Sequence, residues 1–453
     1  MEPANGSGPI AGPQPLPPSP GLSRLAALRL IRKDPIALLE RAARAGDVVA
    51  LPLPRFPLVL VNRPELVWDV LATNNHGFMK GPTMQIAKRL LGESLLTSEG
   101  DVHARQRRLI QPVFHHERID AYADDMVALG ERAADRWRSG DTLDVHQEMA
   151  RLTLAIVGRT LFATDVEAEE SREISAALTE VLAQFNRAFS PFLPITQRLP
   201  LPSTRRFQHA RRVFDRTIYA MIADRRARGT IDGDLLSLLL QAREAGAGMT
   251  DTQVRDEAIT LFLAGHETTA NALTWTWYLL SQHLEAEAAL HSELAEVLGG
   301  RAPTVDDVPR LAVTSAVLSE SMRLYPPAWA IGRRALVEHM ADGFAIPAGS
   351  VVVVSPWLLH HDDRWWPEPA TFRLDRWTDE ARAERPRHAY IPFGGGPRMC
   401  IGEGFARMEV VLLLATIAQR WRFQRESEET VAMQPGVTLR PRTGMPMRAI
   451  ERV

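Results

Sequence analysis

The sequence has little of three things: cysteine, net charge and long apolar runs. Cys400 is the only cysteine among 453 residues, so no disulfide can form within the chain. The formal charge is −2, which gives no basic field of the kind that attracts nucleic acid. No apolar run approaches the ~18 residues that span a bilayer, and the N-terminus lacks a charged-then-apolar signal pattern. We therefore expect no nucleic acid partner, no membrane anchor and a reduced, cytoplasmic setting.

Length alone allows one large domain or two or three small ones, behind a short tail. Residues 1–20 carry seven prolines among glycine, serine and alanine, so we expect a disordered tail. Hydrophobic residues make up 45% of the chain, enough for a substantial core. Helical periodicity dominates residues 21–453, and β-favouring runs such as Val351–Val354 are short. The expected fold class is mainly α with small β-sheets.

The only cysteine lies in an unusual loop, Phe393–Gly402, where three consecutive glycines and a proline precede it. Such a loop bends tightly and allows close approach to its backbone. Helical spacing predicts a helix from Ile401 to Trp421. Cys400 would then lie at a helix N-terminus, next to Arg398, where a thiolate is favoured. A thiolate presented in this way serves either as a nucleophile or as a metal ligand.

A second unusual stretch lies inside the longest predicted helix. Thr250 and Gln253 form a capping box, and nothing forces a stop before His283, so the helix would span roughly 50 Å. Its middle reads Ala-Gly-His-Glu-Thr-Thr, residues 264–269. Glycine costs about 1 kcal/mol there, and polar side chains are expensive to bury unpaired, which favours a functional site. A zinc-protease motif is excluded because position 270 is alanine.

Two further pairs have the spacing of helix neighbours. His103 and Arg107 are four residues apart and share one face, which suits a carboxylate. Glu320 and Arg323 are three apart on a helix predicted from Val308 to Leu324, a geometry that suits a salt bridge. Surface helices contain such pairs often, so neither pair is informative alone.

Together these motifs resemble those of the cytochromes P-450, the haem-thiolate monooxygenases. The cysteine loop matches Phe-x-x-Gly-x-Arg-x-Cys-x-Gly, followed by Ala406 and Glu409. Residues 264–268 are similar to the oxygen-activating motif, and Glu320-x-x-Arg323 is followed by a matching Phe372 to Trp377 segment. That segment departs from the family only in having Leu374 where proline is common. The resemblance covers essentially the whole chain after the tail.

The resemblance implies a single haem-enclosing domain with haem b as cofactor and Cys400 as the axial ligand of its iron. His103 stands where many members have tryptophan, and Arg334 is the close alternative to Arg333 as a propionate ligand. Glu320, Arg323 and Arg376 would form a structural triad. The implied cofactor-binding residues are His103, Arg107, Ala264, Arg333, Phe393, Arg398, Cys400 and Gly402.

The implied reaction inserts one oxygen atom of O2 into a C–H or C=C bond. Thr268 would hydrogen-bond the oxygen, and Glu267 would relay protons from solvent. The segment from Ser190 to Pro202 would gate substrate entry. The expected pocket residues include no charged side chain that would bind a polar group of the substrate. This suggests a lipophilic substrate, such as a terpenoid, fatty acid or steroid. The expected pocket residues are Phe78, Met84, Phe189, Leu261, Ala264, Ala328 and Ile331.

Electrons are expected to come from a separate ferredoxin and its NAD(P)H-dependent reductase, because the chain ends about fifty residues after Cys400. The docking face would carry Arg105, Arg108 and Arg398, and we expect a monomer. Two alternatives remain open: a peroxide-driven peroxygenase of the same fold and a non-catalytic haem-binding or gas-sensing protein. The Glu267–Thr268 pair argues against the peroxygenase.

Overall fold

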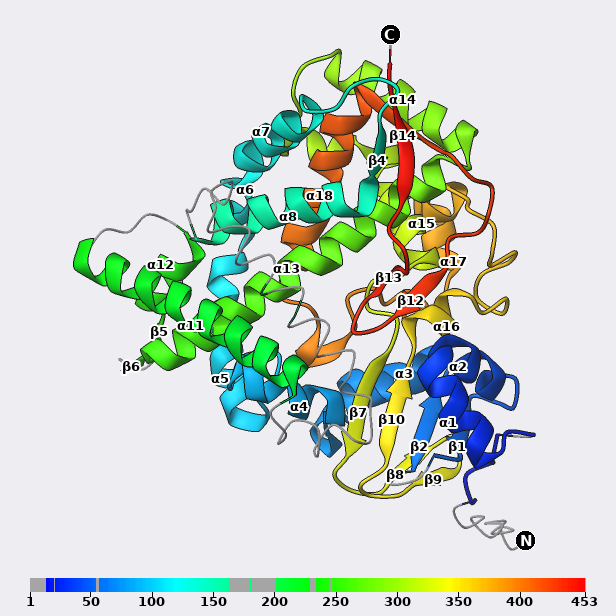
Figure 1. The fold of residues 1–453 in the computed structure, drawn as a ribbon. Helices are drawn as coiled ribbons and strands as arrows, with labels where there is room; N and C mark the ends of the chain where they lie inside the picture. Colours follow the sequence, from blue (N-terminus) through cyan, green and yellow to red (C-terminus); the bar gives the residue numbers. More distant parts are fainter. Residues whose placement is uncertain are drawn as a thin grey trace, which may run out of the picture.

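The computed structural model describes residues 14–19, 21–53, 57–162, 177, 180, 201–228, 234–244 and 247–452. Figure 1 shows a large helical region and a smaller region built around a sheet. The α-helices are α1 (Arg24–Lys33), α2 (Pro35–Ala43), α3 (Pro64–Trp68), α4 (Pro82–Leu91), α5 (Gly100–Ile110), α6 (His116–Asp120), α7 (Ala123–Ala134), α8 (Val145–Phe162), α11 (Pro202–Arg228), α12 (Leu235–Gln241), α13 (Asp251–Leu280), α14 (Leu284–Leu298), α15 (Ala312–Leu324), α16 (Pro356–His360), α17 (Asp379–Glu384) and α18 (Glu403–Ala418).

The strands are short. They are β1 (Val48–Leu51), β2 (Leu58–Val61), β3 (Phe78–Lys80), β4 (Thr142–Asp144), β5 (Arg243–Glu244), β6 (Ala247–Gly248), β7 (Ile331–Ala335), β8 (His339–Ala341), β9 (Phe344–Ile346), β10 (Val351–Val354), β11 (Trp421–Arg425), β12 (Met433–Pro435), β13 (Leu439–Pro441) and β14 (Pro446–Glu451). Short 3₁₀ or π turns are η1 (Asp69–Thr73), η2 (Asn75–Gly77), η3 (Gln111–Phe114), η5 (Val305–Arg310), η6 (Asp375–Trp377) and η7 (Gly396–Arg398). The expected class, mainly α with small sheets, is confirmed.

Helix α13 crosses the middle of the helical region (Figure 1). Its N-terminus is set as the sequence predicts: the Thr250 side chain accepts from the Gln253 N–H at 3.2 Å, and the Gln253 side chain accepts from the Thr250 N–H at 2.9 Å. Helices α8, α15 and α18 pack against it. Helix α18 is buried along most of its length, which explains its apolar sequence from Met408 to Ala418.

The five-stranded sheet has the order β1-β2-β10-β7-β3. Strand β10, the run of four valines, is central because it pairs in parallel with β2 and antiparallel with β7. Val352 and Val354 face the core and are fully buried, whereas Val351 and Val353 are half-buried. The sheet therefore holds β7 and β3, which carry site residues, at its far edge.

The C-terminal end of the predicted tail has backbone contacts with the domain. Residues 14–19 run in extended conformation along the sheet edge rather than free of the domain. The Gln14 N–H donates to Gly343 O at 3.0 Å, and the Ser19 N–H donates to Ala50 O at 3.1 Å. Proline lacks an N–H but keeps its carbonyl, and Pro17 O accepts from the Ala50 N–H at 2.9 Å. Residues 14–19 therefore contact the domain, and residues 1–13 of the tail lie outside the described part.

Among the described residues, no helix combines the length and the apolarity that crossing a membrane requires.

Candidate active site

The loop that carries Cys400 is shaped by its glycines. Gly394 and Gly396 have φ angles of +76° and +70°, the region that favours glycine. A Cβ on Gly396 would lie 2.1 Å from the Leu71 carbonyl oxygen, so the loop packs directly on η1. The Cys400 N–H donates to Phe393 O at 3.0 Å, which closes the loop. The tight bend predicted from the glycine run is therefore present.

The start of the helix after Cys400 differs from the prediction. Helix α18 begins at Glu403, two residues later than Ile401, and Cys400 precedes it with an accessible surface. Burial among protein atoms raises the pKa of the thiol, while the Gly402 N–H and Arg107 lower it. The groups around Cys400 therefore act on its pKa in opposite directions, and its role as a thiolate stays a prediction.

Five basic side chains gather beside this loop: Lys80, His103, Arg107, Arg333 and Arg398. Burial, followed by the charges of the other four, lowers the pKa of His103 to about 4. Burial, with Arg398 also contributing, lowers the pKa of Arg333 to about 10, and burial lowers the pKa of Lys80 to about 7. These groups therefore destabilise one another's charged forms.

Lys80 and Arg333 show most clearly how positive charges are brought together in this cluster. They are direct cross-strand partners on β3 and β7, and they are only 5% and 8% exposed. Like charges directly opposite one another destabilise a sheet. Among the described residues, the acceptors of the Lys80 ammonium are the carbonyls of Leu95 and Ser98, at 2.7 and 2.8 Å. Lys80 is not among the predicted site residues, because it enters the site through strand pairing and has no spacing signal in the sequence.

The carboxylate beside this cluster is Glu99, 2.7 Å from an Arg398 nitrogen. The other terminal nitrogen of Arg398 is buried and has no hydrogen-bond acceptor. Arg334 is exposed, so Arg333 is the arginine that faces this region. Arg107 donates to the Met399 carbonyl at 2.8 Å and so also braces the cysteine loop. A dianionic group, such as the two propionates of a haem, fits this excess of positive charge.

The middle of α13 provides a second accessible surface. From Val254 to Leu280 the helix is buried except at four positions: Ala264, Gly265, Glu267 and Thr268. These are the residues that the sequence singled out as violating helix and burial rules. Helix α18 follows the cysteine loop and also contacts this turn through Glu409. Burial raises the pKa of the Glu409 carboxyl, and the Thr269 side chain opposes that rise. Neither carboxyl oxygen of Glu409 has a well-formed hydrogen bond.

The two polar side chains of this turn have defined partners. The Thr268 hydroxyl donates to the Ala264 carbonyl at 2.6 Å. Glu267 accepts from the Thr438 hydroxyl at 2.8 Å. Burial raises the pKa of Glu267, and the Thr438 hydrogen bond and the charge of Arg440 oppose that shift. The carboxyl is therefore poised to hold a proton more readily than an ordinary glutamate.

The predicted structural triad is assembled in the core. Arg323 donates to both Glu320 oxygens at 2.8 and 2.7 Å, and both side chains are fully buried. An Arg376 nitrogen lies 3.3 Å from a Glu320 oxygen, and the Trp377 indole N–H donates to the Glu320 carboxylate at 3.0 Å. Arg323 also donates to three carbonyls in the segment that precedes the cysteine loop, those of His360, Pro369 and Thr371. The triad thus ties α15 to that segment.

Comparison with known proteins decides the family. The cytochrome P450 family model matches residues 13–446. The chain belongs to the cytochrome P450 family. It is therefore a haem-dependent monooxygenase, and the family match spans the loop that carries Cys400.

Three relatives and a solved structure match this P450 over nearly its full length. Cyclooctatin synthase of Streptomyces melanosporofaciens is 42% identical, over 93% of this chain and 90% of that protein. Cyclooctat-9-en-7-ol 5-monooxygenase of the same organism is 37% identical, over 94% of this chain and 93% of its own. Pentalenene oxygenase of Streptomyces avermitilis is 34% identical, over 92% and 90%. The crystal structure of the cytochrome P450DA heme domain has a TM-score of 0.86 at 25% identity, covering 98% of this chain and 99% of that one.

The predicted pocket residues of this P450 fall into two groups. Met84, Ala328 and Ile331 are half-buried, and Ile331 lies 3.5 Å from where a Cβ on Gly394 would be. In contrast, Phe78 is 1% exposed and packs edge-on against His339 within the sheet core. Leu261 is 7% exposed and belongs to the apolar cluster that α13 forms with α8 and α11. The structure thus gives Phe78 and Leu261 core positions, and Phe189 and residues 190–200 lie outside the described part.

His266 is a site residue that the sequence did not assign in this P450. Its ring Nε2 lies 2.9 Å from the Ala150 carbonyl, which can only accept, so Nε2 carries the proton. The Thr153 hydroxyl donates to the His266 carbonyl at 3.1 Å. Burial lowers the pKa of His266 to about 4, so the ring is neutral. Helix α8 therefore holds the accessible turn of α13 by both the side chain and the backbone of one residue.

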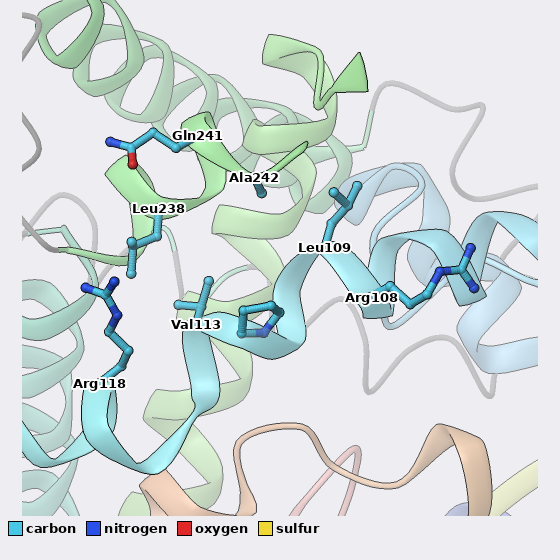
Figure 2. Close-up of a pocket in the computed structure, with 8 residues that line it drawn as sticks. Arg108, Leu109, Val113, Arg118, Leu238, Gln241 and Ala242 are labelled. Carbon is cyan, nitrogen blue, oxygen red and sulfur yellow. The ribbon is translucent and has the colours of Figure 1, made fainter. Parts of the chain in front are cut away.

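A separate surface cavity of about 220 Å³ lies where α5 and η3 meet α12 (Figure 2). Arg118 extends toward Leu238, whereas Arg108 extends away from the apolar floor formed by Leu109 and Val113. The cavity shares no residue with the site around Cys400 and Thr268. It adjoins the predicted docking face through Arg108.

Proposed function

We propose that this P450 uses haem b to insert one oxygen atom of O2 into a lipophilic, terpenoid-like molecule. The single observation that carries this proposal is the pattern of exposure in α13. Its buried middle opens only at Ala264, Gly265, Glu267 and Thr268, the small and proton-bearing residues that oxygen activation needs. Bound haem supplies the electron transfer and the activation of dioxygen, and Cys400 is its ligand.

The residues of the chain have distinct tasks in this proposal. Lys80, Arg333 and Arg398 neutralise the two propionates and orient the cofactor. Ala264 and Gly265 are small and accessible and would leave room for the cofactor and dioxygen. The Thr268 hydroxyl, which donates to the Ala264 carbonyl in this structure, would turn its proton toward bound dioxygen, and Glu267 would hold the proton that is delivered from solvent.

The proposed substrate class rests on the pocket and on the relatives. The half-buried residues of the predicted pocket are Met84, Ala328 and Ile331, which offer apolar contact without a charge, and Ile331 lies beside Gly394 of the cysteine loop. Two relatives are named for pentalenene and for cyclooctat-9-en-7-ol. We therefore favour a terpenoid over a fatty acid, whose carboxylate would require a cation in the pocket.

The proposed electron donor is a separate ferredoxin with its NAD(P)H-dependent reductase, acting on a monomeric P450 in the cytoplasm. The arginine face predicted for docking is smaller than expected. The Arg398 side chain is only 11% exposed and is paired with Glu99, so it cannot lie on a docking surface. Arg108 is exposed and Arg105 is half-buried, which leaves these two on the face of α5.

The test uses the holoenzyme with pentalenene and cyclooctat-9-en-7-ol as probes, and with lauric acid and progesterone as contrasts. We expect a terpenoid probe to shift the ferric Soret band and to yield a product heavier by one oxygen atom. Product should require O2, ferredoxin, reductase and NAD(P)H. Product formation with hydrogen peroxide alone, but not with the reductase system, would identify a peroxygenase. A Soret shift only with lauric acid would reject the terpenoid proposal.

We expect Thr268→Ala to divert electrons from product to hydrogen peroxide. The variant removes the hydroxyl that the accessible turn of α13 presents, so proton delivery loses its last donor. The ratio of product to NAD(P)H consumed should fall about tenfold or more, and Thr268→Ser should largely restore it. Measurement of product, hydrogen peroxide and NAD(P)H in the same reaction decides the matter. Full coupling in Thr268→Ala would remove Thr268 from the mechanism.

A further inference from the structure

A polar chain connects the accessible turn of α13 to the hairpin of β12 and β13. The Asn271 side chain donates to the Thr438 hydroxyl oxygen at 3.1 Å. That hydroxyl in turn donates to Glu267 Oε1 at 2.8 Å. A hydroxyl has only one proton to give, so this arrangement directs it to the carboxylate. Thr438 is 7% exposed and Asn271 is fully buried, so water does not replace these contacts easily.

The backbone around Thr438 is fixed from two sides. The Trp275 indole of α13 donates to the Leu439 carbonyl at 3.0 Å. On the other side, the Leu439 N–H donates to Pro327 O at 2.9 Å, and the Trp329 indole donates to Gly436 O at 2.9 Å. The hairpin turn is therefore held both to α13 and to the segment that contains Ala328. Thr438 has little freedom to leave Glu267.

We propose that Thr438 is a positioning residue that holds the Glu267 carboxyl in place for proton delivery. This inference rests on the proposed function, because it assumes that Glu267 relays protons. With Oε1 occupied by Thr438, Oε2 is the oxygen that exchanges the proton. The hydrogen bond also favours the ionised carboxylate and so limits the rise in pKa that burial causes. Among the described residues, Arg440 is the other charged group whose field acts on Glu267.

The test is an infrared titration of the protonated Glu267 carboxyl in the ferric holoenzyme, assigned by its loss in Glu267→Gln. Thr438→Val keeps the shape of the side chain but removes the donor, so the midpoint should move upward by roughly one pH unit. Thr438→Ser should restore it. Thr276→Val is the matched control. Thr276 is a buried threonine of α13, the helix that carries Glu267, and its hydroxyl donates to the Ala272 carbonyl instead of to Glu267.

An unchanged midpoint in Thr438→Val, with unaltered circular dichroism, would overturn the proposal. So would a shift that Thr438→Ser fails to reverse, since a merely structural effect would then explain it. The coupling of Glu267→Gln is measured separately. If that variant couples normally, the proton-relay role of Glu267 fails, while the infrared titration still reports whether Thr438 controls the carboxyl.

Discussion

Arg323→Leu should lower the free energy of unfolding of this P450 by about 3–5 kcal/mol. The reason is that the change leaves the Glu320 carboxylate buried without its bidentate partner. It also leaves the carbonyls of His360, Pro369 and Thr371 without the guanidinium that binds them. Urea unfolding of the holoenzyme, followed by tryptophan fluorescence and by the Soret band, measures the loss. We expect the Soret band to disappear at least as early as the fluorescence changes, because the affected segment leads into the cysteine loop.

The matched control for this prediction is Arg373→Leu. Arg373 lies in the same segment and pairs with Glu368 and Asp375, but these three side chains are 38%, 67% and 62% exposed. Exposed pairs contribute about 0–1 kcal/mol, so this variant should unfold close to the wild type. If Arg323→Leu were as stable as Arg373→Leu, the triad would not stabilise the cysteine-loop side of the core.

Some of this arrangement could be predicted because it is local or because several motifs agree. The start of α13 follows from Thr250 and Gln253, whose side chains satisfy each other's backbone groups within one turn. The Glu320–Arg323 pair follows from helical spacing, and its third member Arg376 from the family pattern. The accessible turn at Glu267 and Thr268 was predicted because polar residues inside a buried helix require a reason.

Other features depend on contacts that no local pattern records. Thr438 reaches Glu267 across 171 residues, through a hairpin whose position is set by tertiary packing. Lys80 enters the cation cluster because β3 pairs with β7 in one particular register. The environment of Cys400 depends on the whole fold as well, because burial among protein atoms and the Gly402 N–H act on its pKa in opposite directions. The backbone contacts of residues 14–19 likewise depend on their position beside β1.

Cys400→Ser should eliminate the thiolate signature completely. Serine is nearly isosteric, but its hydroxyl is a poor donor to iron at neutral pH, so haem should be lost or bound without a thiolate. Met399→Ala is the control, because Met399 is 38% exposed and the hydrogen bond from Arg107 goes to its backbone carbonyl, which the substitution keeps. The absorbance spectrum of each reduced variant with carbon monoxide gives the comparison. A thiolate spectrum that persisted in Cys400→Ser would mean that Cys400 is not the ligand.

The most direct test of the central claim is the carbon monoxide difference spectrum of the dithionite-reduced wild-type protein. It reports in one measurement whether haem is bound and whether its axial ligand is a thiolate. We predict the strongly red-shifted Soret band that thiolate ligation produces. A band typical of histidine or of a neutral thiol would contradict the assignment of Cys400 as thiolate ligand, and with it the proposed mechanism of oxygen insertion.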